Sequence, residues 1–403
     1  ADTLQGGSGN DTLLGGAGAD AMDGGAGIDG VDYSQSSGGV VVDLTANTGN
    51  GADAQGDTYA NIENLTGSAA GDTLLGNGLA NVLNGGDGND QLSGLAGNDI
   101  INGGNGDDVI TGGAGADALD GGAGTNTLYF GTSFGNLANV SASAGVTISL
   151  DGVTTGVGGD AQGDTYRNFT NVYLTNLADK VTGTAANEWF RGLGGADTID
   201  GGAGTDTVSY WGSSVPGGVS IGLDGAAGTL NEAAGDILTN IEVLQGSQFD
   251  DTLWGNGSAN TIQAMEGNDT IRGDAGADTL DGGSGSDTVT YAASGNAVTV
   301  NLLTSTGSGG DATGDRYTSI ENVTGSALDD TLIGDAGGNT LSGGNGNDYL
   351  RGGQGADTLN GGSGTDTVDY SDSTAAVTIY LDGTAANGGF AQGDVLVSIE
   401  IVN

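Results

Sequence analysis

Residues 85–124 repeat one nine-residue unit in tandem, and this period restricts the possible folds more than any other feature of the chain. Each unit follows the pattern Gly-Gly-x-Gly-x-Asp-x-apolar-x. Glycines permit positive φ and close backbone approach, so six residues can form a tight turn. The other three residues form a minimal strand with one side chain facing inward, at Leu92, Ile101, Ile110 and Leu119.

Such a strand cannot bury a core alone, but stacked copies form a continuous ladder of inward side chains. Stacking also places an aspartate at the same point of every turn. Carboxylates held a strand spacing or two apart repel one another unless a cation lies between them. Carboxylate and carbonyl oxygens select a hard cation, and a flexible loop suits Ca²⁺ better than Mg²⁺. The pattern therefore predicts an all-β solenoid with several calcium ions and essentially no helix.

The nonapeptide resembles that of the RTX (repeats-in-toxin) family of secreted bacterial proteins, of the hemolysin type, and five runs of it cover a little over half of the chain. The resemblance implies a parallel β-roll, in which successive turns alternate between two sides. Turns eighteen residues apart then become neighbours that share a calcium ion. The implied pairs are 6–11 with 24–29, 85–90 with 103–108, 94–99 with 112–117, 264–269 with 282–287, and 343–348 with 361–366.

The candidate calcium ligands are the aspartates at the sixth position of each unit. They are Asp11, Asp20, Asp29, Asp72, Asp90, Asp99, Asp108, Asp117, Asp197, Asp206, Asp251, Asp269, Asp278, Asp287, Asp330, Asp348, Asp357 and Asp366.

The pattern fails at several positions, where we expect weaker or empty sites. Glu188 is one methylene longer than aspartate, and Ala264 replaces the first glycine of its turn. An uncharged amide takes the sixth position at Asn81, Asn126, Asn260 and Asn339. The third run, which contains Glu188, should hold fewer ions than the second.

A longer repeat is superimposed on the short one. The segment GDTYANIEN at 56–64 returns in related form at 163–171, 235–243, 314–322 and 393–401. We therefore divide the chain into five modules, at 1–62, 63–169, 170–241, 242–320 and 321–403. Each module has a nonapeptide run, a connector, an alternating segment, an acidic glycine-rich loop and the GD segment.

The segments between the runs make two further predictions. Alternating Val- and Ile-rich stretches at 40–44, 146–152, 219–225, 298–303 and 377–383 predict longer strands buried on one face. The acidic loops are either further cation sites or solvated turns. Their paired acids are Asp53 with Asp57, Asp160 with Asp164, and Asp311 with Asp315, whereas the third and fifth modules keep only Asp236 and Asp394.

Composition excludes several classes of function. The formal net charge is -46 with only 6 Lys and Arg, which argues against nucleic-acid binding and anionic membranes. With Cys 0 there are no disulfides, and bound metal can take their place as a staple. With His 0 there is no Ser-His-Asp or Cys-His mechanism. No apolar stretch is long enough to form a transmembrane segment.

Three classes of function fit these observations. The first is a non-catalytic structural protein of the bacterial surface or extracellular matrix, such as a surface layer, adhesin or fibre. Such a protein would be secreted, by the type I route that the resemblance implies. The second is the calcium-binding and secretion region of a secreted enzyme, such as a serralysin-type protease or an alginate epimerase. The third is a carbohydrate-active enzyme on a β-solenoid scaffold. The sequence favours the first and assigns no catalytic residue.

Partners other than calcium depend on the two ends and on the aromatic residues. The sequence begins within a nonapeptide and has no capping repeat at either end, which predicts a longer array or covered ends. Head-to-tail or lateral self-association would provide such cover. A surface glycan could stack on aromatic rings, although such rings more often cover the end of a stack. The candidate rings are Trp189, Trp211, Trp254, Tyr33, Tyr210 and Tyr370.

Overall fold

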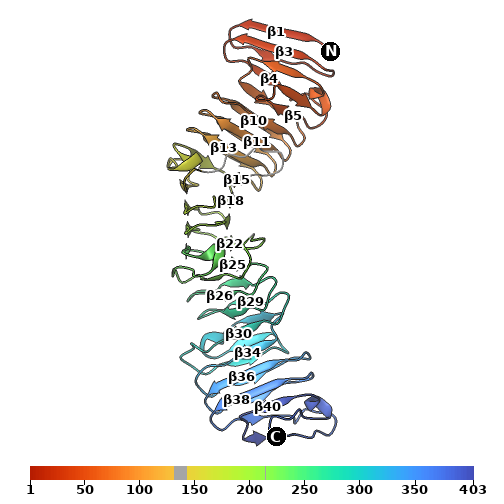
Figure 1. The fold of residues 1–403 in the computed structure, drawn as a ribbon, viewed down its shortest axis with the longest axis vertical. Coiled ribbons are helices and arrows are strands. Elements are labelled where there is room, and N and C mark those ends of the chain that lie inside the picture. Colours follow the sequence, from red (N-terminus) through yellow and green to blue (C-terminus); the bar gives the residue numbers. More distant parts are fainter. Residues whose placement is uncertain (131–142, 214) are drawn as a thin grey trace. The chain divides into compact units, whose positions relative to one another are not determined.

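The computed structural model describes residues 1–130, 143–213 and 215–403, and its regular structure is almost entirely β (Figure 1). No α-helix occurs among the described residues. Short 3₁₀ turns occur at η1 (Ala52–Ala54), η2 (Gly159–Ala161), η3 (Asn231–Ala233), η4 (Gly310–Ala312) and η5 (Gly389–Ala391). The prediction of an all-β solenoid is confirmed. The residues form two compact units, Ala1–Asp206 and Thr207–Asn403. The division into five modules stays a prediction.

The first unit stacks its strands into two long sheets and one short sheet. One long sheet contains β1 (Thr3–Ser8), β3 (Ala21–Ala26), β7 (Thr58–Ala60), β6 (Thr48–Asn50), β5 (Val41–Asp43), β9 (Thr73–Leu75), β11 (Gln91–Ala96), β13 (Val109–Ala114), β15 (Thr127–Tyr129), β18 (Asn171–Tyr173) and β20 (Trp189–Arg191). The other contains β2 (Thr12–Leu13), β4 (Gly30–Asp32), β8 (Asn64–Thr66), β10 (Val82–Asp87), β12 (Ile100–Asn105), β14 (Ala118–Ala123) and β17 (Thr165–Arg167). The short sheet contains β16 (Thr147–Ser149), β19 (Lys180–Thr182) and β21 (Thr198–Asp200).

The second unit has the same two-sided arrangement. One side contains β22 (Thr207–Ser209), β25 (Val243–Gln245), β27 (Thr261–Gln263), β29 (Thr279–Asp281), β33 (Arg316–Thr318), β32 (Thr306–Ser308), β31 (Thr299–Asn301), β35 (Thr331–Ile333), β37 (Tyr349–Arg351), β39 (Thr367–Val368) and β41 (Ile401–Val402). The other side contains β23 (Ser220–Gly222), β26 (Thr252–Trp254), β28 (Thr270–Arg272), β30 (Thr288–Thr290), β34 (Asn322–Thr324), β36 (Thr340–Asn345), β38 (Thr358–Ser363) and β40 (Val395–Val397). The remaining strand of this unit is β24 (Ile237–Thr239).

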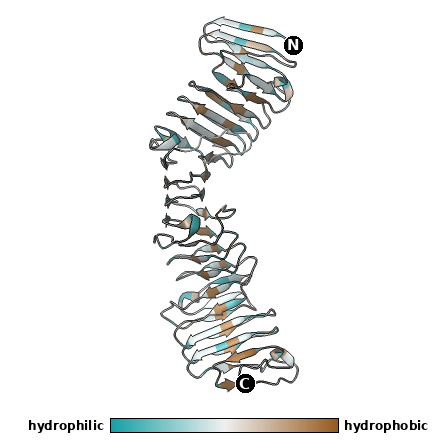
Figure 2. Cartoon of the chain, in the orientation of Figure 1, coloured by the Kyte–Doolittle hydropathy of each residue, from teal (hydrophilic) through white to brown (hydrophobic). Residues whose placement is uncertain are grey.

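Strands pair in parallel with a register of eighteen residues wherever nonapeptides follow one another. On one side Leu83 faces Ile101 and Ile101 faces Leu119. On the other side Leu92 faces Ile110. All five side chains are buried, which makes the continuous apolar ladder that the pattern predicts. Figure 2 shows the apolar bands following one another from strand to strand within each unit.

Two predictions about strand length are wrong. Several nonapeptide strands have six residues instead of three, because identical coils also stack their glycines in register, as Gly86 does on Gly104. The alternating segments are shorter than expected: β5, β16, β23 and β31 have three residues each. Each of these four pairs with the first strand of the next nonapeptide run. No run follows segment 377–383 in the sequence, and its pairing is a single bridge between Thr378 and Asn387.

Candidate metal sites

The sixth-position aspartates form ladders along the roll. The backbone amide of Asp72 donates to Oδ1 of Asp90 (2.8 Å), and the amide of Asp90 donates to Oδ1 of Asp108 (2.9 Å). The amide of Asp99 donates in the same way to Oδ1 of Asp117 (2.8 Å). In the same way, a backbone amide of the preceding coil donates to Oδ1 of Asp20, Asp29, Asp99, Asp197, Asp206, Asp269, Asp278, Asp287, Asp348, Asp357 and Asp366. One carboxylate oxygen of each aspartate thus has a structural role.

The second carboxylate oxygen is buried and has no protein partner at most of these positions. A buried charged oxygen without a donor is costly, so a native structure needs a cation or a proton there. The buried Oδ2 atoms without a hydrogen bond belong to Asp11, Asp20, Asp29, Asp90, Asp99, Asp108, Asp117, Asp269, Asp278, Asp287, Asp348, Asp357 and Asp366. The buried Oε2 of Glu188 is in the same state.

A backbone carbonyl faces the unpartnered oxygen across the first glycine of the turn. A Cβ added to Gly85 would lie 2.1 Å from Oδ2 of Asp90 and 2.5 Å from the carbonyl oxygen of Gly103. Two oxygens therefore converge on a space that only glycine leaves open. The same arrangement of a carboxylate and a next-coil carbonyl surrounds Gly6, Gly94, Gly103 and Gly343. The turns at 6–11, 85–90, 94–99 and 343–348 belong to the predicted pairs, whereas the turn at 103–108 faces the carbonyl of Gly121, outside those pairs.

This donor set fits calcium. Carboxylate and carbonyl oxygens are hard ligands, and Ca²⁺ takes six to eight of them at about 2.3–2.6 Å in flexible geometry. Among the described residues, no group of three or more acidic side chains converges on one point. An ion here would thus depend on backbone carbonyls as much as on carboxylates.

At the first aspartate of several runs the carboxylate and the next-coil carbonyl face one another in the same way, but a serine adds hydrogen-bond donors. The backbone amide of Ser68 donates to Oδ2 of Asp72 (2.5 Å), and its hydroxyl donates to Oδ1 (3.0 Å). Ser247 does the same for Asp251, and Ser326 for Asp330. Both oxygens of these three candidate ligands therefore have protein donors. The spacing Ser-x-x-x-Asp recurs at all three positions and distinguishes these turns in the sequence.

Three of the four asparagines at sixth positions donate to a carbonyl of the neighbouring coil, whereas Nδ2 of Asn260 is buried without a hydrogen bond. The Nδ2 of Asn81 donates to the carbonyl of Glu63 (2.8 Å), and that of Asn339 to the carbonyl of Glu321 (3.0 Å). In the second run, Nδ2 of Asn126 donates to the carbonyl of Asn168 (3.1 Å). An amide can bridge to a carbonyl where a carboxylate cannot, so these turns need no cation to hold their oxygens together.

The second aspartate of each acidic loop is buried and hydrogen-bonded within the roll. Asp57 is buried, and its Oδ1 accepts from the amide of Asp20 (2.8 Å) while its Oδ2 accepts from the hydroxyl of Tyr33 (2.6 Å). Asp164 and Asp315 accept equivalent bonds from Tyr166 and Tyr291. These aspartates end the ladders, a role that sequence reasoning missed.

The same contacts exclude three of the candidate aromatic rings from stacking on a sugar. Tyr33, Tyr210 and Tyr370 are buried, and their hydroxyls donate to Asp57, Asp236 and Asp394. They cover the inside of a coil and cannot reach a glycan. Trp211 is exposed, whereas Trp189 and Trp254 are half-buried.

Burial raises the pKa of the ladder carboxyls. Removal from water is the largest cause, and it raises the pKa of Asp90 to about 7, with neighbouring carboxylates adding to the effect. The pKa of Asp269 rises to about 8 and that of Asp357 to about 7 for the same reasons. Without a cation, the folded roll therefore favours protonated aspartates.

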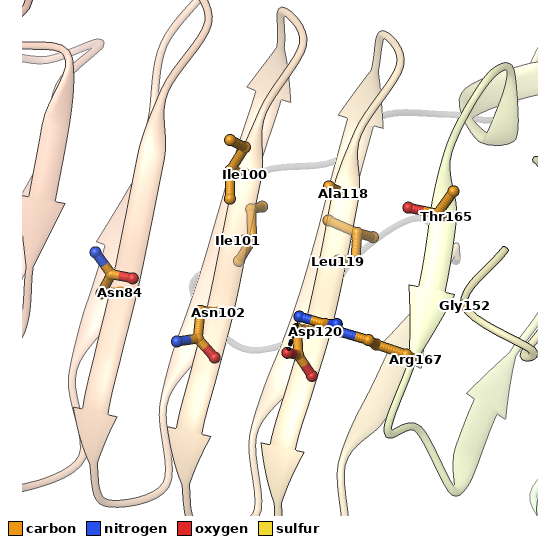
Figure 3. Close-up of a pocket in the computed structure, with 10 residues that line it drawn as sticks. All are labelled: Asn84, Ile100, Ile101, Asn102, Ala118, Leu119, Asp120, Gly152, Thr165 and Arg167. Carbon is orange, nitrogen blue, oxygen red and sulfur yellow. Dashed lines mark ion pairs between the residues drawn. The ribbon is translucent and has the colours of Figure 1, made fainter.

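The outer face of the second long sheet carries a groove of about 390 Å³ in the first unit (Figure 3). Its polar floor is a row of Asn84, Asn102 and Asp120 on successive strands. Arg167 reaches across to Asp120 and forms an ion pair of 2.7 Å. Asp120 also accepts from Nδ2 of Asn168 (2.6 Å) and from the backbone amide of Gly122 (3.1 Å), so this carboxylate already has three partners. The groove is separate from the carboxylate–carbonyl cradles.

Within the described residues, no helix is long and apolar enough to cross a membrane. No curated protein matches the chain. A family model described as the RTX calcium-binding nonapeptide repeat (4 copies) matches residues 1–31, 66–101, 93–128, 182–212, 239–262, 254–289, 324–359 and 333–368. These matches cover more than half of the chain and coincide with the turns described above. The chain belongs to the family of RTX calcium-binding nonapeptide repeat proteins.

Proposed function

We propose that the chain is a non-catalytic structural protein of the bacterial cell surface or extracellular matrix, which folds on calcium after secretion. RTX repeats are calcium-binding units typical of secreted proteins. The surface role is supported by the extent of the repeats, which recur throughout the sequence. The acidic side chains within the roll are engaged in ladders and turns.

The observation that carries calcium binding is the set of buried, unpartnered Oδ2 atoms that face carbonyl oxygens. At about 5 Å, close to a strand spacing, two carboxylates repel by roughly 3 kcal/mol in an effective dielectric of about 20. A bound cation removes this repulsion and gives both kinds of oxygen a partner. We therefore assign ions to the cradles, such as those of Asp90, Asp99, Asp108 and Asp348, and none to Asp72, Asp251 or Asp330, whose oxygens serine already satisfies.

Charge provides the link between secretion and folding. With a formal net charge of -46, the chain repels itself while calcium is scarce and stays extended. Extracellular calcium modules typically bind at about 10⁻⁴–10⁻³ M. An ion that binds only the folded state contributes about 2.7 kcal/mol per site at a hundred times its Kd. Binding free energy thus becomes folding free energy.

The alternative is that these repeats are the calcium-binding and secretion region of a secreted enzyme. Calcium-driven folding is common to both proposals, but assembly is not. A surface layer or fibre must associate with copies of itself, whereas the repeat region of an enzyme has no such requirement.

The test is a calcium titration followed by circular dichroism and light scattering on the same samples. We expect coil to convert to β-structure near millimolar calcium and EGTA to reverse the change. Growth into ordered particles would support the structural role, and a constant mass would support the alternative. A full β-signal in EGTA that calcium does not alter would refute calcium-driven folding.

A further inference from the structure

We propose a second kind of calcium site, formed where the last turn of a nonapeptide run meets the connector that follows it. Its carboxylate comes from the last aspartate of the run, and its facing carbonyl comes from a connector residue outside any nonapeptide. The three sites pair Asp29 with Asn61, Asp287 with Ser319, and Asp366 with Ser398. The inference rests on the proposed function, because it extends calcium binding from repeat–repeat to repeat–connector contacts.

The geometry of these junctions reproduces that of the repeat cradles. A Cβ added to Gly24 would lie 2.2 Å from the carbonyl oxygen of Asn61 and 2.7 Å from Oδ2 of Asp29. At Gly282 the distances are 2.1 Å to the carbonyl of Ser319 and 2.6 Å to Oδ2 of Asp287. At Gly361 they are 2.4 Å to the carbonyl of Ser398 and 2.5 Å to Oδ2 of Asp366. Each junction therefore offers the two oxygen types that a repeat pair offers.

The connector carbonyl lies at this point because its residue adopts left-handed backbone geometry. The φ angles are 53° at Asn61, 49° at Ser319 and 52° at Ser398. Left-handed φ is uncommon for residues other than glycine and costs conformational free energy. The same conformation recurs at the corresponding position of all five modules, with φ of 60° at Asn168 and 52° at Asn240, so the backbone conformation is shared along the chain.

The carboxylates at these junctions are fully enclosed. Asp29, Asp287 and Asp366 are each 0% exposed, and the Oδ2 of each has no hydrogen-bond partner.

A glutamate adds a second negative charge at every one of the three junctions. Oε2 of Glu63 accepts from the backbone amide of Asp29 (2.9 Å), and Oε2 of Glu321 accepts from that of Asp287 (2.8 Å). The amide of Asp366 donates to Oε2 of Glu400 (2.9 Å). Two carboxylates and a carbonyl at one junction repel one another, and a bound cation would remove this repulsion.

The second module provides an internal contrast. There Asn126 takes the place of the aspartate, and Thr170 takes the place of the glutamate. Both negative charges are absent together, and Nδ2 of Asn126 donates to the carbonyl of Asn168 (3.1 Å), itself a left-handed residue with φ 60°. An N–H bond fills the role that we assign to an ion in the first, fourth and fifth modules.

The experiment counts calcium ions per chain by native mass spectrometry and checks folding by circular dichroism. The variant Asp29→Asn/Asp287→Asn/Asp366→Asn copies the second module, so we expect it to fold and bind three fewer ions. The reverse variant Asn126→Asp/Thr170→Glu, which restores both negative charges, should bind one more. The control Asp315→Asn changes a buried ladder aspartate whose two oxygens already have protein donors, and should leave the count unchanged.

The outcomes separate this inference from the proposed function. A folded triple variant with an unchanged ion count overturns the junction sites and leaves the repeat sites intact. If the triple variant does not fold, Asn126→Asp/Thr170→Glu decides: one additional ion supports the inference and none refutes it. A wild-type chain that binds no calcium at all refutes the proposed function together with the inference.

Discussion

The backbone amide of Asp90 donates a 2.9 Å hydrogen bond to Oδ1 of Asp108. The Asp108 carboxylate thus binds the preceding coil through Oδ1 and leaves Oδ2 available to an ion. The two roles can be separated by substitution. Asp108→Asn keeps an oxygen for the amide of Asp90 and loses the ionic ligand. Asp108→Ala loses both, and leaves a buried N–H without an acceptor.

We expect Asp108→Ala to be less stable than Asp108→Asn by about 1–3 kcal/mol, the usual cost of an unsatisfied buried polar group. Urea unfolding of both variants in saturating calcium measures this difference. Both should bind one ion fewer than the wild type. Equal unfolding free energies would show that the ladder hydrogen bond does not contribute to stability.

The apolar ladder predicts unequal effects at two adjacent isoleucines. Ile101 is 0% exposed between Leu83 and Leu119, whereas Ile100 is 55% exposed on the outer face of β12. Ile101→Ala should lower the free energy of unfolding by about 2–5 kcal/mol, because it leaves a cavity in the stack. Ile100→Ala is the matched control and should change stability by less than about 0.5 kcal/mol. Similar losses at both positions in chemical denaturation would contradict the two-faced strand.

Replacing Ala264 with glycine should create an additional calcium site. The methyl group of Ala264 occupies the space that glycine leaves open in other turns, and Asp269 beside it keeps a buried Oδ2 without a partner. Ala264→Gly should therefore add one calcium ion per chain, despite a backbone cost of about 0.5–1 kcal/mol. The reciprocal change Gly343→Ala, at the equivalent turn of the fifth run, should remove one ion. Ion counts from native mass spectrometry that move in neither variant would refute the cradle.

The raised pKa values predict opposite pH dependences with and without calcium. The pKa values of Asp90, Asp117, Asp278 and Asp357 lie near 7 in the folded state, against an ordinary value of 3.8. Without calcium, the folded state binds more protons than the unfolded state between these values, so stability should fall as the pH rises from 4 to about 7.

With calcium, protons compete with the ion for the same carboxylates, so the calcium concentration at the folding midpoint should rise as the pH falls below about 7. Thermal melts in EGTA at several pH values check the first dependence, and calcium titrations check the second. A calcium-free roll that becomes more stable with rising pH would contradict the assigned protonation.

Much of the roll could be predicted from the nonapeptide alone. The period set the positions of Leu83, Ile101 and Leu119, and the eighteen-residue pairing follows once turns alternate between two sides. Strand length could not be read in this way, because glycines that signal a turn in one coil pair with identical glycines in the next. Gly86 and Gly104 are both turn residues and strand partners.

The candidate sites could likewise be predicted only in part from the sequence. The repeat located the carboxylates, but it did not distinguish Asp72, whose oxygens Ser68 already satisfies, from Asp90, whose Oδ2 has no donor. That distinction depends on contacts four residues apart in one turn. The junction pair of Asp29 and Asn61 depends on residues far apart in sequence, which meet only because a connector returns to the stack.

The ladders also have a direction. The amide belongs to the earlier coil and the carboxylate to the later one, as in the series Asp72, Asp90 and Asp108. Any cut across the roll therefore produces two unlike surfaces, one with hydrogen-bond donors and one with anionic acceptors. Donor and acceptor surfaces fit each other but not themselves. A head-to-tail arrangement would place donors against acceptors, whereas a twofold axis would place like groups against like.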